Sequence, residues 1–92
     1  MRILIVEDEP RLADALGQIM REQKYLTDVV HDGADGLDYA ATNQYDVIVL
    51  DVMLPKRNGF DVARELRRKK IMTPILMLTA RGEVSDRVAG LD

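Results

Sequence analysis

The stretch that decides the fold is RILIV, residues 2–6, which leads directly into three acids, Glu7, Asp8 and Glu9. An unbroken aliphatic run of this length is typical of a strand that is buried on both faces, as in a parallel sheet covered by helices. Similar runs follow along the chain: LTDVV at 26–30, VIVL at 47–50 and ILML at 75–78. The sequence therefore predicts four strands, and the more polar run at 26–30 is expected at an edge of the sheet.

Amphipathic stretches separate these runs and predict helices. Apolar side chains recur at helical spacing in three of them: Leu12, Leu16, Ile19 and Met20; Ala34, Leu37 and Ala41; Val62, Ala63 and Leu66. We expect a fourth helix to begin near Val84. Strands that alternate with helices favour right-handed crossovers and helices on both faces of a mostly parallel sheet. The prediction is one doubly wound α/β domain over residues 1–92.

Composition narrows the class of protein. Apolar residues make up 47% of the chain and charged residues 32%, which suits a globular domain with a hydrophobic core. The net charge of −3 argues against a nucleic-acid-binding domain, and the absence of cysteine excludes disulfides and thiolate metal sites. No run reaches the roughly 18 apolar residues of a membrane helix, and no signal peptide is evident. We therefore expect a cytoplasmic protein without membrane contact.

Polar side chains follow three of the predicted strands at their carboxyl ends, where doubly wound sheets bind ligands. They are Glu7 and Asp8 after the first, Asp51 at the end of the third, and Thr79 at the end of the fourth. If these strands are neighbours, three carboxylates and one hydroxyl meet at one edge. Like charges this close disfavour joint ionisation unless a cation offsets them, and Mg²⁺ takes carboxylate, water and phosphate oxygens. The pattern predicts a Mg²⁺ site at which a carboxylate is the nucleophile and becomes an aspartyl phosphate.

The segment VMLPKRNG at 52–59 connects the third strand to the next helix. Pro55 fixes φ, and Gly59 permits a positive φ that other residues resist, so this loop could aim a main-chain carbonyl at a metal. A plain connection punctuated by proline and glycine explains the same residues.

Three motifs together resemble the response-regulator receiver domain of two-component systems: ILIVEDE at 3–9, VLDVMLP at 49–55 with Gly59, and PILMLTA at 74–80. The segment DRVAGLD at 86–92 is similar to the OmpR/PhoB-like winged-helix subfamily. The resemblance covers the whole chain and implies a flavodoxin-like fold with strand order 2-1-3-4-5.

The resemblance also implies roles for the site residues. Asp51 would accept the phosphoryl group, and Thr79 would hydrogen-bond it as a switch, beside the small residue Ala80. The Mg²⁺ ligands would be Asp8 and Asp51 directly, Glu7 through water, and Met53 through its main-chain carbonyl. The donor would be a phosphohistidine on a sensor histidine kinase. The receiver would control an output such as transcription through a DNA-binding domain of the parent protein, and would itself contact no nucleic acid.

The chain departs from the family in one respect. A complete receiver continues into a fifth strand with a switching aromatic residue, a lysine that pairs with the phosphoryl group, and a fifth helix, and these 92 residues contain no counterpart. The strand order then becomes 2-1-3-4, and residues 74–80 become a long apolar edge. We expect a homodimer or a domain-swapped oligomer to cover this edge.

Two other functions remain open. A phosphorylation-impaired assembly module would keep the fold with an idle site. An aspartyl-phosphate phosphohydrolase would carry a second Asp two residues after the nucleophile, where this chain has Met53. A receiver phosphorylates itself and loses the group slowly, so we do not expect a turnover enzyme. The basic group at 64–70 is interpreted as a solvated helix end, because Glu65 interrupts it and no aromatic residue interleaves.

Overall fold

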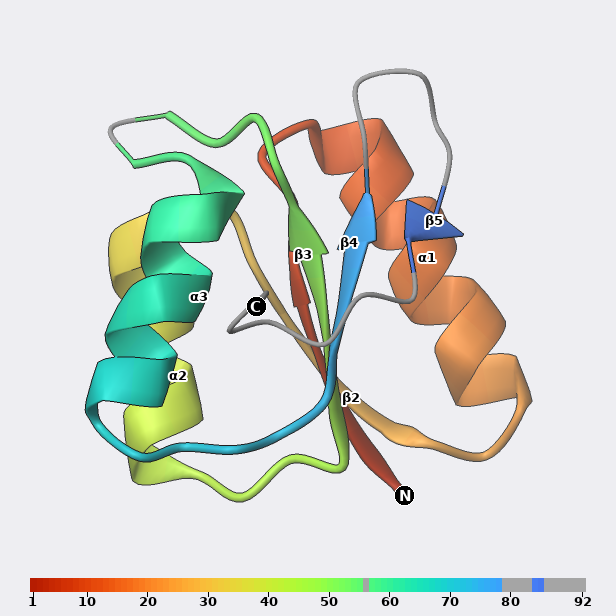
Figure 1. Cartoon of the computed structure of the whole chain (residues 1–92). Coiled ribbons are helices and arrows are strands. Elements are labelled where there is room, and N and C mark those ends of the chain that lie inside the picture. Colours follow the sequence, from red (N-terminus) through yellow and green to blue (C-terminus); the bar gives the residue numbers. More distant parts are fainter. Residues whose placement is uncertain (56, 79–83, 86–92) are drawn as a thin grey trace.

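The computed structural model describes residues 1–55, 57–78 and 84–85. Within these ranges, five strands form one sheet in the order β2-β1-β3-β4-β5. Their bounds are β1 (Arg2–Val6), β2 (Leu26–Val30), β3 (Val47–Asp51), β4 (Ile75–Leu78) and β5 (Val84–Ser85). The first four strands run parallel, which confirms the predicted order 2-1-3-4 and places β2 at an edge of the sheet (Figure 1).

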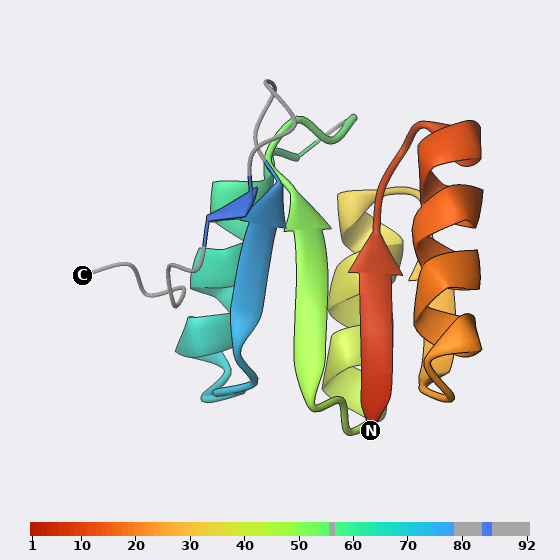
Figure 2. The same cartoon turned by 90° about the vertical axis from the view of Figure 1, so that its right-hand side faces the viewer.

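Within the described part of the chain, three helices cover the two faces of this sheet. α1 (Pro10–Glu22) packs against β1 and β2 on one face. α2 (Gly33–Thr42) and α3 (Gly59–Arg68) lie side by side on the other face, as both views show (Figure 1 and Figure 2). Among the described helices, none has the length and apolar character needed to cross a membrane.

The core is divided between the two faces because successive side chains of a strand alternate in direction. The larger cluster lies toward α2 and α3 and includes Leu50 and Met77. The smaller cluster lies toward α1 and is built around Ile3, Ile5 and Val49. The central strands are therefore buried on both faces, as their continuous aliphatic runs predict.

The segment at β5 differs from the sequence prediction. The sequence predicts a helix from near Val84, but Val84 and Ser85 form a short strand that pairs antiparallel with Leu78 and Met77. Residues 86–92, over which that helix would continue, lie outside the described residues. The physical reason is the free edge of β4, whose main-chain N–H and C=O groups require partners. The described residues contain no further parallel strand. Because β5 is only two residues long, the first half of β4 has no strand partner on that side within the described ranges.

Candidate metal centre

Three carboxylates converge at the carboxyl end of the sheet. Glu7 and Asp8 directly follow β1, and Asp51 is the last residue of β3. The two strands are adjacent, with Val6 paired to Leu50. One ligand oxygen from each of the three carboxylates lies within 4.8 Å of the other two. This confirms the prediction that acids from two neighbouring strands meet at one edge.

The three acids differ in burial, and burial changes their pKa values. Glu7 is 2% exposed and Asp51 is 9% exposed, whereas Asp8 is open to solvent. Burial raises the pKa of Glu7 to about 7, opposed by the Glu9 N–H and reinforced by the charge of Asp51. Burial likewise raises the pKa of Asp51, against the lowering effect of the Met53 N–H. A cation would offset both effects, because it stabilises the ionised carboxylates.

Main-chain N–H groups hold the two buried carboxylates in place. Glu7 Oε2 accepts a hydrogen bond from the N–H of Glu9 at 2.9 Å. Asp51 Oδ1 accepts one from the N–H of Met53 at 3.0 Å. Each carboxylate is therefore oriented by the turn that immediately follows its own strand.

Gly59 is required for a close approach and not for a positive φ. Glycine permits a positive φ, but Gly59 is the first residue of α3 and its φ lies outside the left-handed region. A Cβ atom at this position would overlap the main-chain oxygen of Asp51 and lie 2.9 Å from Cα of Val52. The Gly59 N–H donates to the carbonyl of Val52 at 2.7 Å. Only a residue without a side chain lets α3 begin this close to the end of β3.

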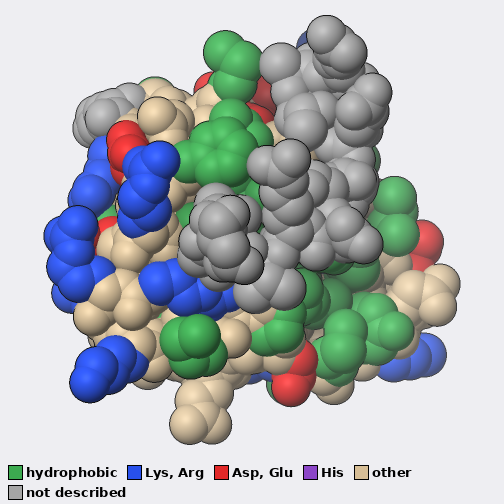
Figure 3. Space-filling model, viewed as in Figure 1, with side chains coloured by type: hydrophobic (Ala, Val, Ile, Leu, Met, Phe, Trp, Pro, Cys, Tyr) green, Lys and Arg blue, Asp and Glu red, His purple; other side chains and the backbone are tan. Residues whose placement is uncertain are grey.

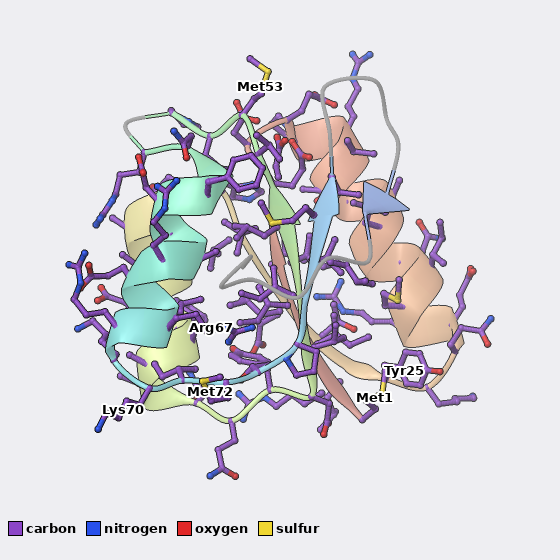
Figure 4. All side chains as sticks on the ribbon, in the orientation of Figure 1. Met1, Tyr25, Met53, Arg67, Lys70 and Met72 are labelled. Atoms are coloured by element: carbon purple, nitrogen blue, oxygen red, sulfur yellow. The ribbon has the colours of Figure 1, made fainter. Side chains whose placement is uncertain are left out.

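The remaining residues proposed from the sequence lie partly outside the described ranges. Thr79 and Ala80 are among the residues that the structure does not describe, and so is Lys56. The N–H of Met53 faces Asp51, while its side chain is 62% exposed and points outward at the carboxyl end of the sheet (Figure 4). The Met53 carbonyl as a metal ligand stays a prediction.

Sequence reasoning missed two contacts at this site. The Glu9 carboxylate caps α1, accepting from the N–H of Arg11 at 3.2 Å and of Leu12 at 3.0 Å. An acid directly before a proline at the first helical position is a signal that could have found this cap. His31 Nδ1 lies 3.0 Å from the Glu7 carbonyl oxygen. No sequence signal predicts that contact, because it joins the ends of two different strands.

The fold and the site together define a flavodoxin-like α/β protein with an acidic cluster at its topological switch point, between β1 and β3. Within that class, the chain belongs to the response regulator receiver domain family, whose family model matches residues 3–92. Receiver domains are signalling modules, and this one is of the kind found in transcriptional response regulators.

The relatives are transcriptional regulators of greater length. The chain is 49% identical over 92 residues to the transcriptional regulatory protein TcrA of Mycobacterium tuberculosis, covering 100% of this chain and 36% of TcrA. It is 50% identical over 92 residues to the transcriptional regulatory protein CutR of Streptomyces coelicolor, covering 100% of this chain and 42% of CutR. The chain thus spans about two fifths of the length of these relatives.

Solved structures show the same fold. The receiver domain of a Francisella response regulator superposes with a TM-score of 0.84 at 33% identity, covering 89% of this chain and 68% of that one. The response regulator TrrA of Thermotoga maritima, solved in complex with Mg(2+)-BeF, superposes with a TM-score of 0.81 at 37% identity, covering 86% of this chain and 69% of that one.

Proposed function

We propose that this chain accepts a phosphoryl group on the carboxylate of Asp51. The observation that carries the proposal is the convergence of Glu7, Asp8 and Asp51, with one oxygen of each within 4.8 Å of the others. Asp51 is the central candidate because β3 lies between β1, which ends at the other two acids, and β4. The register pairs Asp51 with Leu78, the residue that Thr79 follows in the sequence.

The donor set fits Mg²⁺, a hard cation that prefers carboxylate oxygens. Raised carboxyl pKa values in a partly buried cluster are what a site built around a cation shows without its ion. We assign the ion to Asp8 and Asp51 directly, to Glu7 through water and to the main-chain carbonyl of Met53. When bound, Mg²⁺ neutralises the charge on the transferring phosphoryl group.

In the proposed phosphoryl transfer, Asp51 is the nucleophile. A carboxylate oxygen of Asp51 attacks the phosphorus of a phosphohistidine on a sensor histidine kinase. The new O–P bond forms as the N–P bond breaks, and the imidazole leaves with the bonding electron pair and takes up a proton. The hydroxyl of Thr79 donates to a phosphoryl oxygen, and the small side chain of Ala80 leaves room for the group. Later attack by water on the phosphorus of the acyl phosphate restores Asp51, so the domain is a signalling switch and not a turnover enzyme.

The proposed partners follow from this role and from the relatives. The phosphoryl donor is a sensor histidine kinase in the cytoplasm. Because the relatives are transcriptional regulators, the proposed output is transcription, through a DNA-binding domain of the parent protein. The receiver itself contacts neither nucleic acid nor membrane, and a second copy of the chain is its proposed assembly partner.

Acetyl phosphate and Mg²⁺, followed by intact mass measurement, test the proposal. We expect the wild-type chain to gain one phosphoryl group, Asp51→Asn to gain none, and Asp38→Asn to behave like the wild type. Asp38 is a suitable control because it is an exposed carboxylate on α2, away from the cluster. Equal gain by Asp51→Asn would refute Asp51 as acceptor. No gain by the wild type would support an assembly module, and continuous phosphate release would support a phosphohydrolase.

A further inference from the structure

Glu7, Asp8 and Glu9 are consecutive acids, yet only the first two contribute to the acidic cluster. The carboxylate of Glu9 turns away to α1, where it accepts hydrogen bonds from the N–H groups of Arg11 and Leu12. These donors lie in the first turn of the helix, where N–H groups have no partner within the helix itself. The Glu9 carboxylate therefore caps the helix and does not belong to the acidic cluster.

The main chain of Glu9 joins the helix to the cluster. Its N–H donates to Glu7 Oε2 at 2.9 Å, and its carbonyl accepts from the N–H of Ala13 at 2.9 Å. One residue thus holds a carboxylate of the metal centre through its N–H and the first turn of α1 through its carbonyl and its carboxylate.

The position of α1 on the sheet determines where Glu9 lies. Ala13 is fully buried against the sheet, and a Cβ atom at Gly17 would lie only 3.1 Å from a methyl carbon of Val29 in β2. The helix therefore packs closely on β2. Glu9 accepts hydrogen bonds from the start of this helix through both its carboxylate and its carbonyl. These bonds fix the direction of the Glu9 N–H.

We propose that Glu9 is a positioning residue of the metal centre: by capping α1 it keeps its N–H aimed at Glu7 and so fixes the direction of the Glu7 carboxylate. The inference rests on the proposed function, because it assumes that Glu7 serves a Mg²⁺ site. Groups that orient metal ligands commonly change metal affinity by 10- to 100-fold when they are removed. The Glu9 side chain acts one step further away, so its removal belongs at the low end of that range.

Titration of the full chain with MgCl₂, followed by calorimetry, measures the effect directly. We expect Glu9→Ala to raise the Kd for Mg²⁺ roughly tenfold. Glu9→Asp should restore affinity close to that of the wild type, because aspartate is among the best N-cap residues. Hydrogen exchange gives a second readout that needs no metal: the amide of residue 9 should exchange faster in Glu9→Ala and return to the wild-type rate in Glu9→Asp.

Asp32→Ala is the matched control. The Asp32 carboxylate caps α2 by accepting a hydrogen bond from the N–H of Asp35 at 2.8 Å. Asp32→Ala therefore removes a comparable helix cap, but one that is not linked to Glu7. We expect similar thermal destabilisation and an unchanged Kd for Mg²⁺. Unchanged affinity in Glu9→Ala, or equal weakening in Asp32→Ala, would overturn the inference alone. Absence of Mg²⁺ binding by the wild-type chain would overturn the proposed function together with it.

Discussion

At the residue scale, three adjacent acids have three different environments. Glu7 is buried at the end of β1, Asp8 is exposed beside it, and the Glu9 carboxylate caps a helix. The cause is the change from strand to helix within three residues, which turns each side chain in a different direction. Burial then acts on Glu7 most strongly, because its carboxyl group loses solvation while it also faces Asp51.

The raised pKa of Glu7 predicts how stability depends on pH without metal. Its pKa in the folded chain, about 7, lies above the ordinary value of 4.5. A raised carboxyl pKa stabilises the fold below the ordinary value, and this contribution is lost as pH rises through about 7. In the presence of a chelator, we expect the free energy of unfolding to fall over this range by about 3 kcal/mol, since a shift of one pKa unit corresponds to about 1.4 kcal/mol.

Urea melts at a series of pH values provide the measurement. Glu7→Gln should remove most of the dependence, whereas Glu22→Gln, an exposed acid near the end of α1, should leave it intact. Saturating Mg²⁺ should oppose the fall, because metal binding requires the deprotonated ligand. Stability that does not change with pH in the chelator would contradict the burial of an ionisable Glu7.

Gly59 leads to a second prediction at this scale. Because an added Cβ would overlap the Asp51 carbonyl oxygen, Gly59→Ala should destabilise the fold by about 1–3 kcal/mol and impair phosphorylation of Asp51. Gly17→Ala is the comparison: its Cβ would lie 3.1 Å from a Val29 methyl carbon, a close contact with a side chain and not with the main chain, so we expect a smaller loss of stability and normal phosphorylation. Chemical denaturation and mass measurement check both effects. If Gly59→Ala matched the wild type in both, the close approach would have no importance for the site.

At the element scale, α3 has an apolar inner face and a charged outer face. Its inner face buries Val62, Ala63 and Leu66, and Asn58 caps its start by accepting from the N–H of Asp61 at 2.9 Å. Lys and Arg side chains gather on the outer surface over this helix (Figure 3). Two of these arginines form ion pairs with acids of the same helix, Arg64 with Asp61 and Arg68 with Glu65.

The basic group at 64–70 is therefore mainly a solvated helix face, as the sequence predicts. Arg64 and Arg68 are exposed and paired with acids of the same helix, a type of ion pair that contributes little to stability. Arg67 differs, because its side chain points toward the sheet and donates to the carbonyl of Ile71 at 2.6 Å, whereas Lys70 points outward (Figure 4).

The docking of α3 should depend on its apolar face. Leu66 is 1% exposed within the larger core cluster, so Leu66→Ala should lower the free energy of unfolding by about 2–5 kcal/mol. Leu26→Ala makes the same chemical change at a side chain that is 71% exposed and should cost no more than about 0.5 kcal/mol. Urea denaturation measures the difference, and similar costs at the two sites would contradict the observed burial.

At the scale of the whole molecule, the two faces of the sheet are covered unequally. α2 and α3 cover one face, whereas α1 packs on β1 and β2 on the other (Figure 2). Within the described ranges, the first half of β4 has no strand partner at the outer edge of the sheet. Apolar strand edges of this kind pair with other chains.

We therefore predict that the chain self-associates through β4. Sedimentation at micromolar concentration should show a dimer or a larger oligomer in equilibrium with monomer. Leu76→Lys should dissociate it, since a lysine at a strand edge opposes edge-to-edge pairing, while Leu26→Lys should not. Circular dichroism confirms that each variant remains folded. A compact wild-type monomer at every concentration would refute the prediction.

Much of the fold and part of the site follow from local sequence patterns. The runs at 2–6, 47–50 and 75–78 predicted three strands, because a continuous run of aliphatic residues is a signal that neighbouring residues carry by themselves. The position of Asp51 at a strand end predicted its place at the carboxyl edge. The helix expected from near Val84 does not begin there, because Val84 and Ser85 pair with the edge of β4, and residues 86–92 lie outside the described residues. The need for glycine at position 59 comes from its close approach to the end of β3, which no local pattern specifies.

Residue type and short-range spacing were enough to predict the alternation of strands and helices and the kind of chemistry available. The burial of Glu7, the exposure of Asp8 and the capping of α1 by Glu9 became apparent only in the folded chain. So did the start of α3 against the carbonyl of Asp51. The reason is that solvation, charge interactions and close packing depend on which residues distant in the chain come together, and no local pattern specifies those contacts.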